Sequence, residues 1–244
     1  MTKIEAIEQI MKDNGGSATL QFIYENIEKY YPNAKRSSNW EAGLRGVLYR
    51  EIYNDTKRFK KIGLSIYALY DYKEETKPSI NDKLRMHSYI EGICLELGNL
   101  HKFDTYTADP SGVYRDNLLL SSFSSLHTIP PFSYDEILHT VKLIDVIWFN
   151  KDGLQFPQKA FEVVDSVGTM TGAFNRSLQL KQFKTEFYIV APEKHKDKFY
   201  QTIELEIYKP TKDRFKFINY ETIISYYDNL LKTKNIESLI FGWS

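Results

Sequence analysis

This chain of 244 residues has a single cysteine, Cys94, and no excess of charge of either sign. One cysteine excludes a disulfide framework and a zinc site built from thiolates, and it suits a protein kept in a reducing compartment. Basic and acidic residues number 32 each, so the chain as a whole has no field that would attract polyanions. Any binding to nucleic acid must therefore come from local clusters of basic residues.

Long apolar runs are also absent. No stretch of about 18 apolar residues occurs that could span a bilayer, and no apolar run follows a basic start as in a signal peptide. The five histidines show no spacing typical of metal ligands; they are His87, His101, His127, His139 and His195. We expect a soluble, cytoplasmic protein without membrane contacts.

What the chain does have is two apolar segments that each contain an acidic residue. Residues 143–149 read Leu-Ile-Asp-Val-Ile-Trp-Phe, and residues 159–166 read Lys-Ala-Phe-Glu-Val-Val-Asp-Ser. Both predict strands, and the Gly-Pro turn between them predicts that the strands are neighbours. The pattern would therefore bury Asp145 and Glu162.

A buried, isolated carboxylate is costly unless a cation or hydrogen-bond donors meet it. Two such groups on paired strands suggest a divalent metal site. Oxygen ligands suit Mg²⁺, which binds substrate phosphates beside one or two protein carboxylates. The alternative is that one or both acids lie at strand ends in water or pair with a lysine.

The two acids, the hairpin and a following helix with Arg176 resemble the core of the PD-(D/E)XK nucleases, in particular a restriction-endonuclease-like branch. The resemblance implies that Asp145 and Glu162 are the catalytic, metal-binding acids. In that family a lysine or glutamate stands two residues after the second acid, and here that position is Val164. Asp165 is acidic, but in a regular strand it would point to the opposite face.

Three explanations stay open for this departure. A bulge could redirect Asp165. Alternatively, the role moves to the following helix, where Arg176, Gln179 and Lys181 are within reach, or the site is inactive. We therefore count Asp165, Gln179 and Lys181 as candidate catalytic residues.

A polar, charged segment at residues 73–83 predicts a linker between two domains. Before it, residues 1–72 predict three helices and a terminal hairpin, which together make a winged helix; the helices cover about 4–11, 20–31 and 37–52, and the strands 58–61 and 64–69. The ending resembles the wing of HARE-type helix-turn-helix modules. That resemblance implies a winged-helix DNA-binding domain.

Basic residues crowd the third predicted helix and the first wing strand, where a helix-turn-helix protein meets DNA. They are Lys35, Arg36, Arg45, Arg50, Lys57, Arg58, Lys60 and Lys61. Together with Arg176, they are the candidate DNA-binding residues. The alternative is a solvated basic face on a module that binds protein.

Residues 84–244 predict an α/β (α+β) domain with a mixed central sheet flanked by helices. The expected order includes helices at 84–100, 169–183, 194–207 and 221–231, strands at 103–107, 186–191 and 215–218, and an irregular stretch at 114–135. This order is similar to that of the PD-(D/E)XK core, whose first helix often adds an acid to the metal site. Glu91 or Glu96 would fill that place, although an ordinary surface glutamate is the simpler interpretation of each.

The resemblance implies a type II restriction endonuclease that cleaves double-stranded DNA with Mg²⁺, as a homodimer because one such site cuts one strand. Val164 keeps a second hypothesis open, namely a DNA-binding protein or subunit with a degenerate nuclease core. A third hypothesis is a modification-dependent endonuclease that senses a methylated base.

Overall fold

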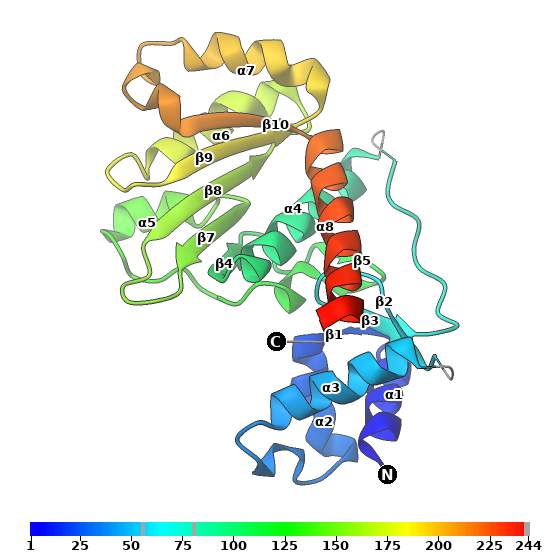
Figure 1. The fold of residues 1–244 in the computed structure, drawn as a ribbon. Coiled ribbons are helices and arrows are strands. Elements are labelled where there is room, and N and C mark those ends of the chain that lie inside the picture. Colours follow the sequence, from blue (N-terminus) through cyan, green and yellow to red (C-terminus); the bar gives the residue numbers. More distant parts are fainter. Residues whose placement is uncertain (55–56, 80–81, 242–244) are drawn as a thin grey trace. The chain divides into compact units, whose positions relative to one another are not determined.

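The computed structural model describes residues 1–54, 57–79 and 82–241 (Figure 1). The chain divides into two compact units. One contains Met1–Thr76 together with Asn229–Ser244, and the other contains Lys77–Asp228. Sequence analysis did not predict that the C-terminal residues group with the N-terminal unit.

The N-terminal unit combines helices with a small antiparallel sheet. Its elements are α1 (Lys3–Asp13), β1 (Ser17–Thr19), α2 (Leu20–Tyr30), the 3₁₀ helix η1 (Ala34–Arg36), α3 (Trp40–Tyr53), β2 (Phe59–Lys61) and β3 (Ile66–Leu69). The strand order is β1-β3-β2. Sequence analysis missed β1, which has only three residues and leads directly into α2.

Local signals explain where these helices start. Thr2 and Glu5 form a capping box at α1, since the Thr2 N–H donates to Glu5 Oε2 at 2.8 Å and the Glu5 N–H donates to Thr2 Oγ1 at 3.3 Å. Thr19 caps α2 by accepting the Phe22 N–H at 3.1 Å. Within the core, the Tyr49 and Tyr67 hydroxyls lie 2.6 Å apart and join α3 to β3.

The second unit is built on a sheet of five strands in the order β10-β9-β8-β7-β4. Its strands are β4 (Phe103–Thr107), β7 (Val146–Asn150), β8 (Pro157–Val163), β9 (Glu186–Ala191) and β10 (Phe215–Asn219). The pairs β10-β9 and β9-β8 are parallel, whereas β8-β7 and β7-β4 are antiparallel. The predicted α/β fold with a mixed central sheet is confirmed.

Helices cover both faces of this sheet. They are α4 (Lys83–Leu100), α5 (Asp135–Val141), α6 (Met170–Leu178), α7 (Lys196–Ile203) and the start of α8 (Tyr220–Phe241), with shorter 3₁₀ turns between them. A separate two-stranded hairpin of β5 (Val113–Arg115) and β6 (Leu118–Leu119) follows β4.

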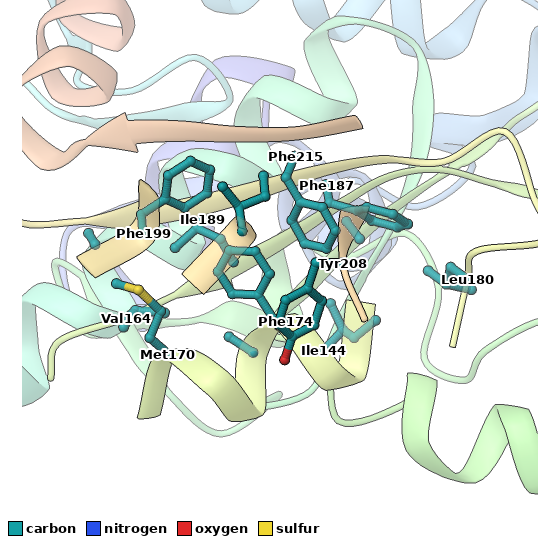
Figure 2. Packing of buried hydrophobic residues seen from close by; sticks show 14 of the residues in the cluster. Ile144, Val164, Met170, Phe174, Leu180, Phe187, Ile189, Phe199, Tyr208 and Phe215 are labelled. Carbon is teal, nitrogen blue, oxygen red and sulfur yellow. The ribbon is translucent and has the colours of Figure 1, made fainter. Parts of the chain in front are cut away.

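Alternation along β7 sends neighbouring side chains to opposite faces. Ile147 and Phe149 join a buried cluster with Phe174 of α6 and Phe199 of α7, part of which Figure 2 shows. Trp148 points to the other face, where its Nε1–H donates to the Cys94 carbonyl of α4 at 3.0 Å. The sheet is therefore held between α4 on one side and α6 with α7 on the other.

Close contact between α4 and the sheet depends on Gly98. A Cβ at this position would lie 2.5 Å from Thr105 Cγ2 and 2.7 Å from Trp148 Nε1. Both distances are far below van der Waals contact, so any larger residue would push α4 away from the sheet. This close approach matters because α4 also carries side chains that reach the point where β7 begins.

Several predicted boundaries were wrong. The stretch 114–135, predicted to be irregular, contains most of the β5-β6 hairpin and leads into α5. Strand β7 starts at Val146, so Asp145 precedes it, and β8 ends at Val163. Asp165 thus lies beyond the strand, and the alternation rule that would have turned it away does not apply to it.

Candidate active site

Polar side chains from four segments of the second unit converge where β7 begins. Helix α4 supplies His87 and Glu91, which are one turn apart and so share a face. Asp145 comes directly before β7, Asp165 follows β8, and Arg176 comes from α6. All of these except Glu91 line a pocket of about 220 Å³, together with Val163, Val164, Ser166 and Thr169.

The backbone of β8 holds Asp145. Its Oδ2 atom accepts a hydrogen bond of 2.7 Å from the Val163 N–H. Burial raises the pKa of Asp145, although the charge of His87 and this N–H donor oppose the rise. This hydrogen bond fixes the carboxylate in the lining of the pocket.

The His87 ring lies between acidic groups. Its Nδ1 is 2.6 Å from Asp165 Oδ2, and the Tyr220 hydroxyl donates to Asp165 Oδ1 at 2.6 Å. Its Nε2 is 3.7 Å from Glu91 Oε1 and 3.9 Å from Asp145 Oδ2. Burial alone would lower the pKa of His87, but the Asp165 hydrogen bond and the surrounding carboxylates outweigh it and raise that pKa to about 9.

Glu91 is almost completely buried, with 1% of its surface exposed. Within the described part of the chain, its Oε2 atom has no hydrogen-bond partner. Burial and the nearby charge of Asp145 raise the pKa of Glu91 well above its usual value. A buried carboxylate oxygen without a donor is suited to contact with a cation.

The donors present fit a divalent metal ion. His87, Glu91 and Asp145 each offer one ligand atom, and these three atoms all lie within 4.8 Å of one another. Two carboxylates and an imidazole are ordinary ligands for divalent ions in proteins. Sequence analysis proposed Glu91 and Asp145 for this site but did not predict His87.

Glu162, the second predicted acid, is fully buried and forms a two-pronged ion pair with Arg176. Arg176 Nε donates to Glu162 Oε1 at 2.7 Å, and Nη2 donates to Oε2. Burial raises the pKa of Glu162 and the guanidinium opposes this, while Glu162 in turn raises the pKa of Arg176. Both oxygens of Glu162 are therefore already in use.

Other candidates lie in different surroundings. Glu96 is buried and accepts hydrogen bonds from the hydroxyls of Tyr114, at 3.2 Å, and Tyr227. Gln179 and Lys181 follow the end of α6 and, of the residues that the structure describes, are not among those lining the pocket. Their catalytic roles remain predictions.

Val164 packs in the buried cluster with Phe174 and Ile189, and is 1% exposed (Figure 2). The position where the PD-(D/E)XK pattern has a charged residue is thus part of the hydrophobic core. Asp165, one residue further along, reaches the pocket instead, because β8 has already ended there.

The sequence contained one signal for His87 that was not used. His87 and Glu91 are spaced four residues apart in a predicted helix, which places them on one face. Tyr220 gave no such signal, because it lies 55 residues from its partner Asp165.

The eight basic residues of the N-terminal unit differ in their freedom to bind a partner. Arg45 donates to the Tyr24 hydroxyl at 3.0 Å, and Lys60 donates to the Tyr72 carbonyl at 2.6 Å. Arg58 lies 3.5 Å from Glu8 and 3.8 Å from Glu51.

Four of the eight basic residues are exposed, and within the described part of the chain their charged groups form no hydrogen bond with another side chain. They are Lys35, Arg36, Arg50 and Lys57. Lys35 Nζ stands 5.2 Å from the centre of the Trp40 ring. Arg50 Nε lies 3.9 Å from Glu51, and the Arg50 side chain is 65% exposed. These four are the better placed candidates for binding a polyanion.

Comparison with known proteins identifies the family. Residues 70–240 match the family described as the type II restriction enzyme NmeDI C-terminal domain. Because the match covers well over half of the chain, the chain belongs to this family of restriction-enzyme domains. No curated protein and no solved structure matches significantly. Of the helices in the described ranges, none is long and apolar enough to cross a membrane.

Proposed function

We propose that the chain is a type II restriction endonuclease that hydrolyses phosphodiester bonds of double-stranded DNA with a divalent metal ion. Membership of a restriction-enzyme family supports a nuclease. The observation that carries the metal dependence is the convergence of His87, Glu91 and Asp145 within the matched region, with a buried oxygen of Glu91 lacking a donor. Magnesium, the ion predicted from the sequence, remains a prediction.

The residues of the site divide the chemical work. A bound divalent ion supplies charge to polarise the scissile phosphate and to lower the pKa of a water molecule. Glu91 and Asp145 hold such an ion with their oxygens, and the Val163 N–H keeps Asp145 in place. Arg176 uses two of its five N–H donors on Glu162, so others remain to bind a phosphate oxygen in the pocket.

We also propose that the second unit has the PD-(D/E)XK core. The order α4, β4, β7, β8, α6, β9 supports this, since it gives a helix, three antiparallel strands, a helix and a parallel strand. Glu91, Asp145 and Glu162 stand at the places that the resemblance assigns to acids. In this proposal Arg176 pairs with Glu162 beside the pocket.

Residues 1–72 are proposed to be a winged-helix domain that binds DNA. Support comes from the order α1, β1, α2, α3, β2, β3, and from the exposed basic residues at and before α3. A homodimer is proposed as well, because one such site cuts one strand and a double-strand break requires two.

One observation favours a second candidate function, a DNA-binding subunit with an inactive core. Val164 is packed in the hydrophobic core, and both oxygens of Glu162 are bound by Arg176. A site of this kind would lack one charged group of the family pattern and have another neutralised.

The deciding experiment incubates the purified full chain with plasmids of varied sequence, methylated and unmethylated, with Mg²⁺, with Mn²⁺ and with EDTA. We expect discrete fragments with a divalent ion and none with EDTA. Asp145→Asn keeps an acceptor for the Val163 N–H and should lower cleavage at least about a hundredfold. Asp152→Asn, at an exposed acid in the β7-β8 turn, is the matched control and should cut normally.

Failure to cut any substrate with either ion would favour the inactive core. Cutting that requires methylated DNA would identify a modification-dependent enzyme. Cleavage that survives Asp145→Asn would remove the proposed site.

A further inference from the structure

We propose that His87 Nε2 is a third protein ligand, beside Glu91 and Asp145, in a metal site of mixed nitrogen and oxygen donors. The site then favours divalent transition ions such as Mn²⁺ and Co²⁺ over Mg²⁺. This inference rests on the proposed function for the presence of a metal, and it adds the ligand and the class of ion.

The first argument is the direction of the ring. Asp165 Oδ2 lies 2.6 Å from His87 Nδ1, and a carboxylate there accepts the Nδ1–H. A metal ion that displaces the Nε2 proton leaves the Nδ1–H bonded to Asp165 and uses the lone pair of Nε2. Nε2 faces Glu91 and Asp145, which are acceptors as well. A histidine held at one nitrogen by a carboxylate, with the other turned to a cluster of acids, is the usual arrangement of a metal-ligating imidazole.

The second argument is distance. Nε2 lies 3.7 Å from Glu91 Oε1 and 3.9 Å from Asp145 Oδ2, and neither separation is that of a hydrogen bond. Ligands about 2.1 Å from one ion stand about 3 to 4 Å from each other, so both separations suit a shared ion. The unpartnered Oε2 atom of Glu91, a residue 1% exposed, independently points to a carboxylate that can hold a cation.

Tyr220 makes the arrangement rigid. Its hydroxyl donates to Asp165 Oδ1 at 2.6 Å, so each Asp165 oxygen has its own partner. Asp165 and Tyr220 are therefore positioning residues, which act on the metal through the ring of His87. Such outer partners usually change metal affinity by about 10- to 100-fold when they are removed.

The class of ion follows from the donors. Magnesium prefers oxygen ligands in near-ideal octahedral geometry, whereas imidazole suits transition ions. The nitrogen of His87 should thus add more to the binding of Mn²⁺ or Co²⁺ than to that of Mg²⁺.

The test measures metal binding by the full chain without DNA. Calorimetry with Mn²⁺, Co²⁺ and Mg²⁺ should show tighter binding of the first two, and Co²⁺ should give a visible absorption band that shifts on loss of a nitrogen ligand. His87→Gln should weaken the binding of Mn²⁺ and Co²⁺ at least about tenfold, and that of Mg²⁺ less. Asp165→Asn and Tyr220→Phe should weaken Mn²⁺ binding less than His87→Gln does. His139→Gln, at an exposed histidine of α5, is the matched control. Circular dichroism and thermal unfolding without metal confirm that each variant folds.

Unchanged Mn²⁺ affinity and an unchanged Co²⁺ spectrum in folded His87→Gln or His87→Ala would overturn the proposal, as would the absence of Mn²⁺ and Co²⁺ binding by the unaltered chain. Plasmid cleavage tests the proposed nuclease function separately from the metal ligand. If His87→Gln still cleaves DNA and still binds metal, the role of His87 as a ligand is wrong but the nuclease proposal stands. If metal binding depends on His87 but the chain cleaves no DNA, the ligand role is supported and the nuclease proposal is wrong.

Discussion

Helix α4 carries two buried glutamates whose surroundings differ. Glu91 and Glu96 are each 1% exposed. Glu96 accepts hydrogen bonds from two tyrosine hydroxyls, whereas the Oε2 atom of Glu91 has no partner within the described residues. Burial is the same for both, so burial does not distinguish a structural acid from a candidate functional one.

Glu162, on the central sheet, also shows that burial alone does not mark a functional acid. It is fully buried, and Arg176 binds both of its oxygens. A group whose charge is already balanced stabilises the fold. A buried carboxylate oxygen without a donor, such as Glu91 Oε2, is open to a cation, because burial without a partner disfavours its charged form.

The largest expected effect comes from removing the cation that balances Glu162. Arg176→Met keeps much of the side-chain volume but leaves a buried carboxylate unpaired, which should cost about 3 to 5 kcal/mol of unfolding free energy. Urea denaturation measures this, with Arg36→Met, at an exposed residue, as the control. A loss below about 1 kcal/mol would mean that Glu162 is protonated or reaches other donors.

The next effect concerns Val164, at the position where the PD-(D/E)XK pattern has a charged residue. Val164→Glu would restore that charge but places it among Phe174 and Ile189, so we expect a loss of about 3 kcal/mol and no gain of cleavage. Val167→Glu, at an exposed valine nearby, should change stability by about 0.5 kcal/mol or less. A stable Val164→Glu protein with increased cutting would show that the core rearranges to admit the acid.

The surroundings of Glu162 and Val164 also show which features of the site could be predicted from the sequence. The strand with Glu162, the helix with Glu91 and the mixed sheet were predictable, because apolar periodicity and element order are local signals. Asp145 was expected inside a strand and precedes β7 instead. The approach of Asp165 was not, because it depends on β8 ending at Val163 rather than continuing.

His87 and Tyr220 were missed for a related reason. Their shared partner, Asp165, follows β8 and is distant from both in sequence, so only tertiary packing brings the three together. Strands β1, β5 and β6, of two or three residues each, are too short to produce a periodic pattern.

A matched pair of substitutions sharpens the comparison within α4. Glu91→Gln should lower cleavage and metal affinity at least about a hundredfold while leaving stability without metal unchanged or higher, because burial disfavours the charged carboxylate and glutamine is neutral. Glu96→Gln should leave cleavage unchanged and cost about 1 to 2 kcal/mol of unfolding free energy, since the tyrosine hydroxyls lose a charged acceptor. Calorimetric metal titration and urea denaturation of both variants measure these effects. If the two variants exchanged behaviours, hydrogen-bond satisfaction would not be the property that marks the site.

The smallest effect is expected in the N-terminal unit, where the exposed basic residues are candidates for phosphate contacts. Arg45 and Lys60 are engaged within the protein, so the sharper test replaces Lys35, Arg36 and Arg50 with alanine. Each lost phosphate contact should flatten the dependence of DNA affinity on salt concentration by about one unit of slope and weaken binding equally for all sequences. Fluorescence anisotropy across a salt series measures the slope, and alanine at the exposed Lys151, Lys184 and Lys194 of the other unit is the control. An unchanged slope in the first variant with a reduced slope in the control would place DNA on the second unit and leave the N-terminal unit to bind protein.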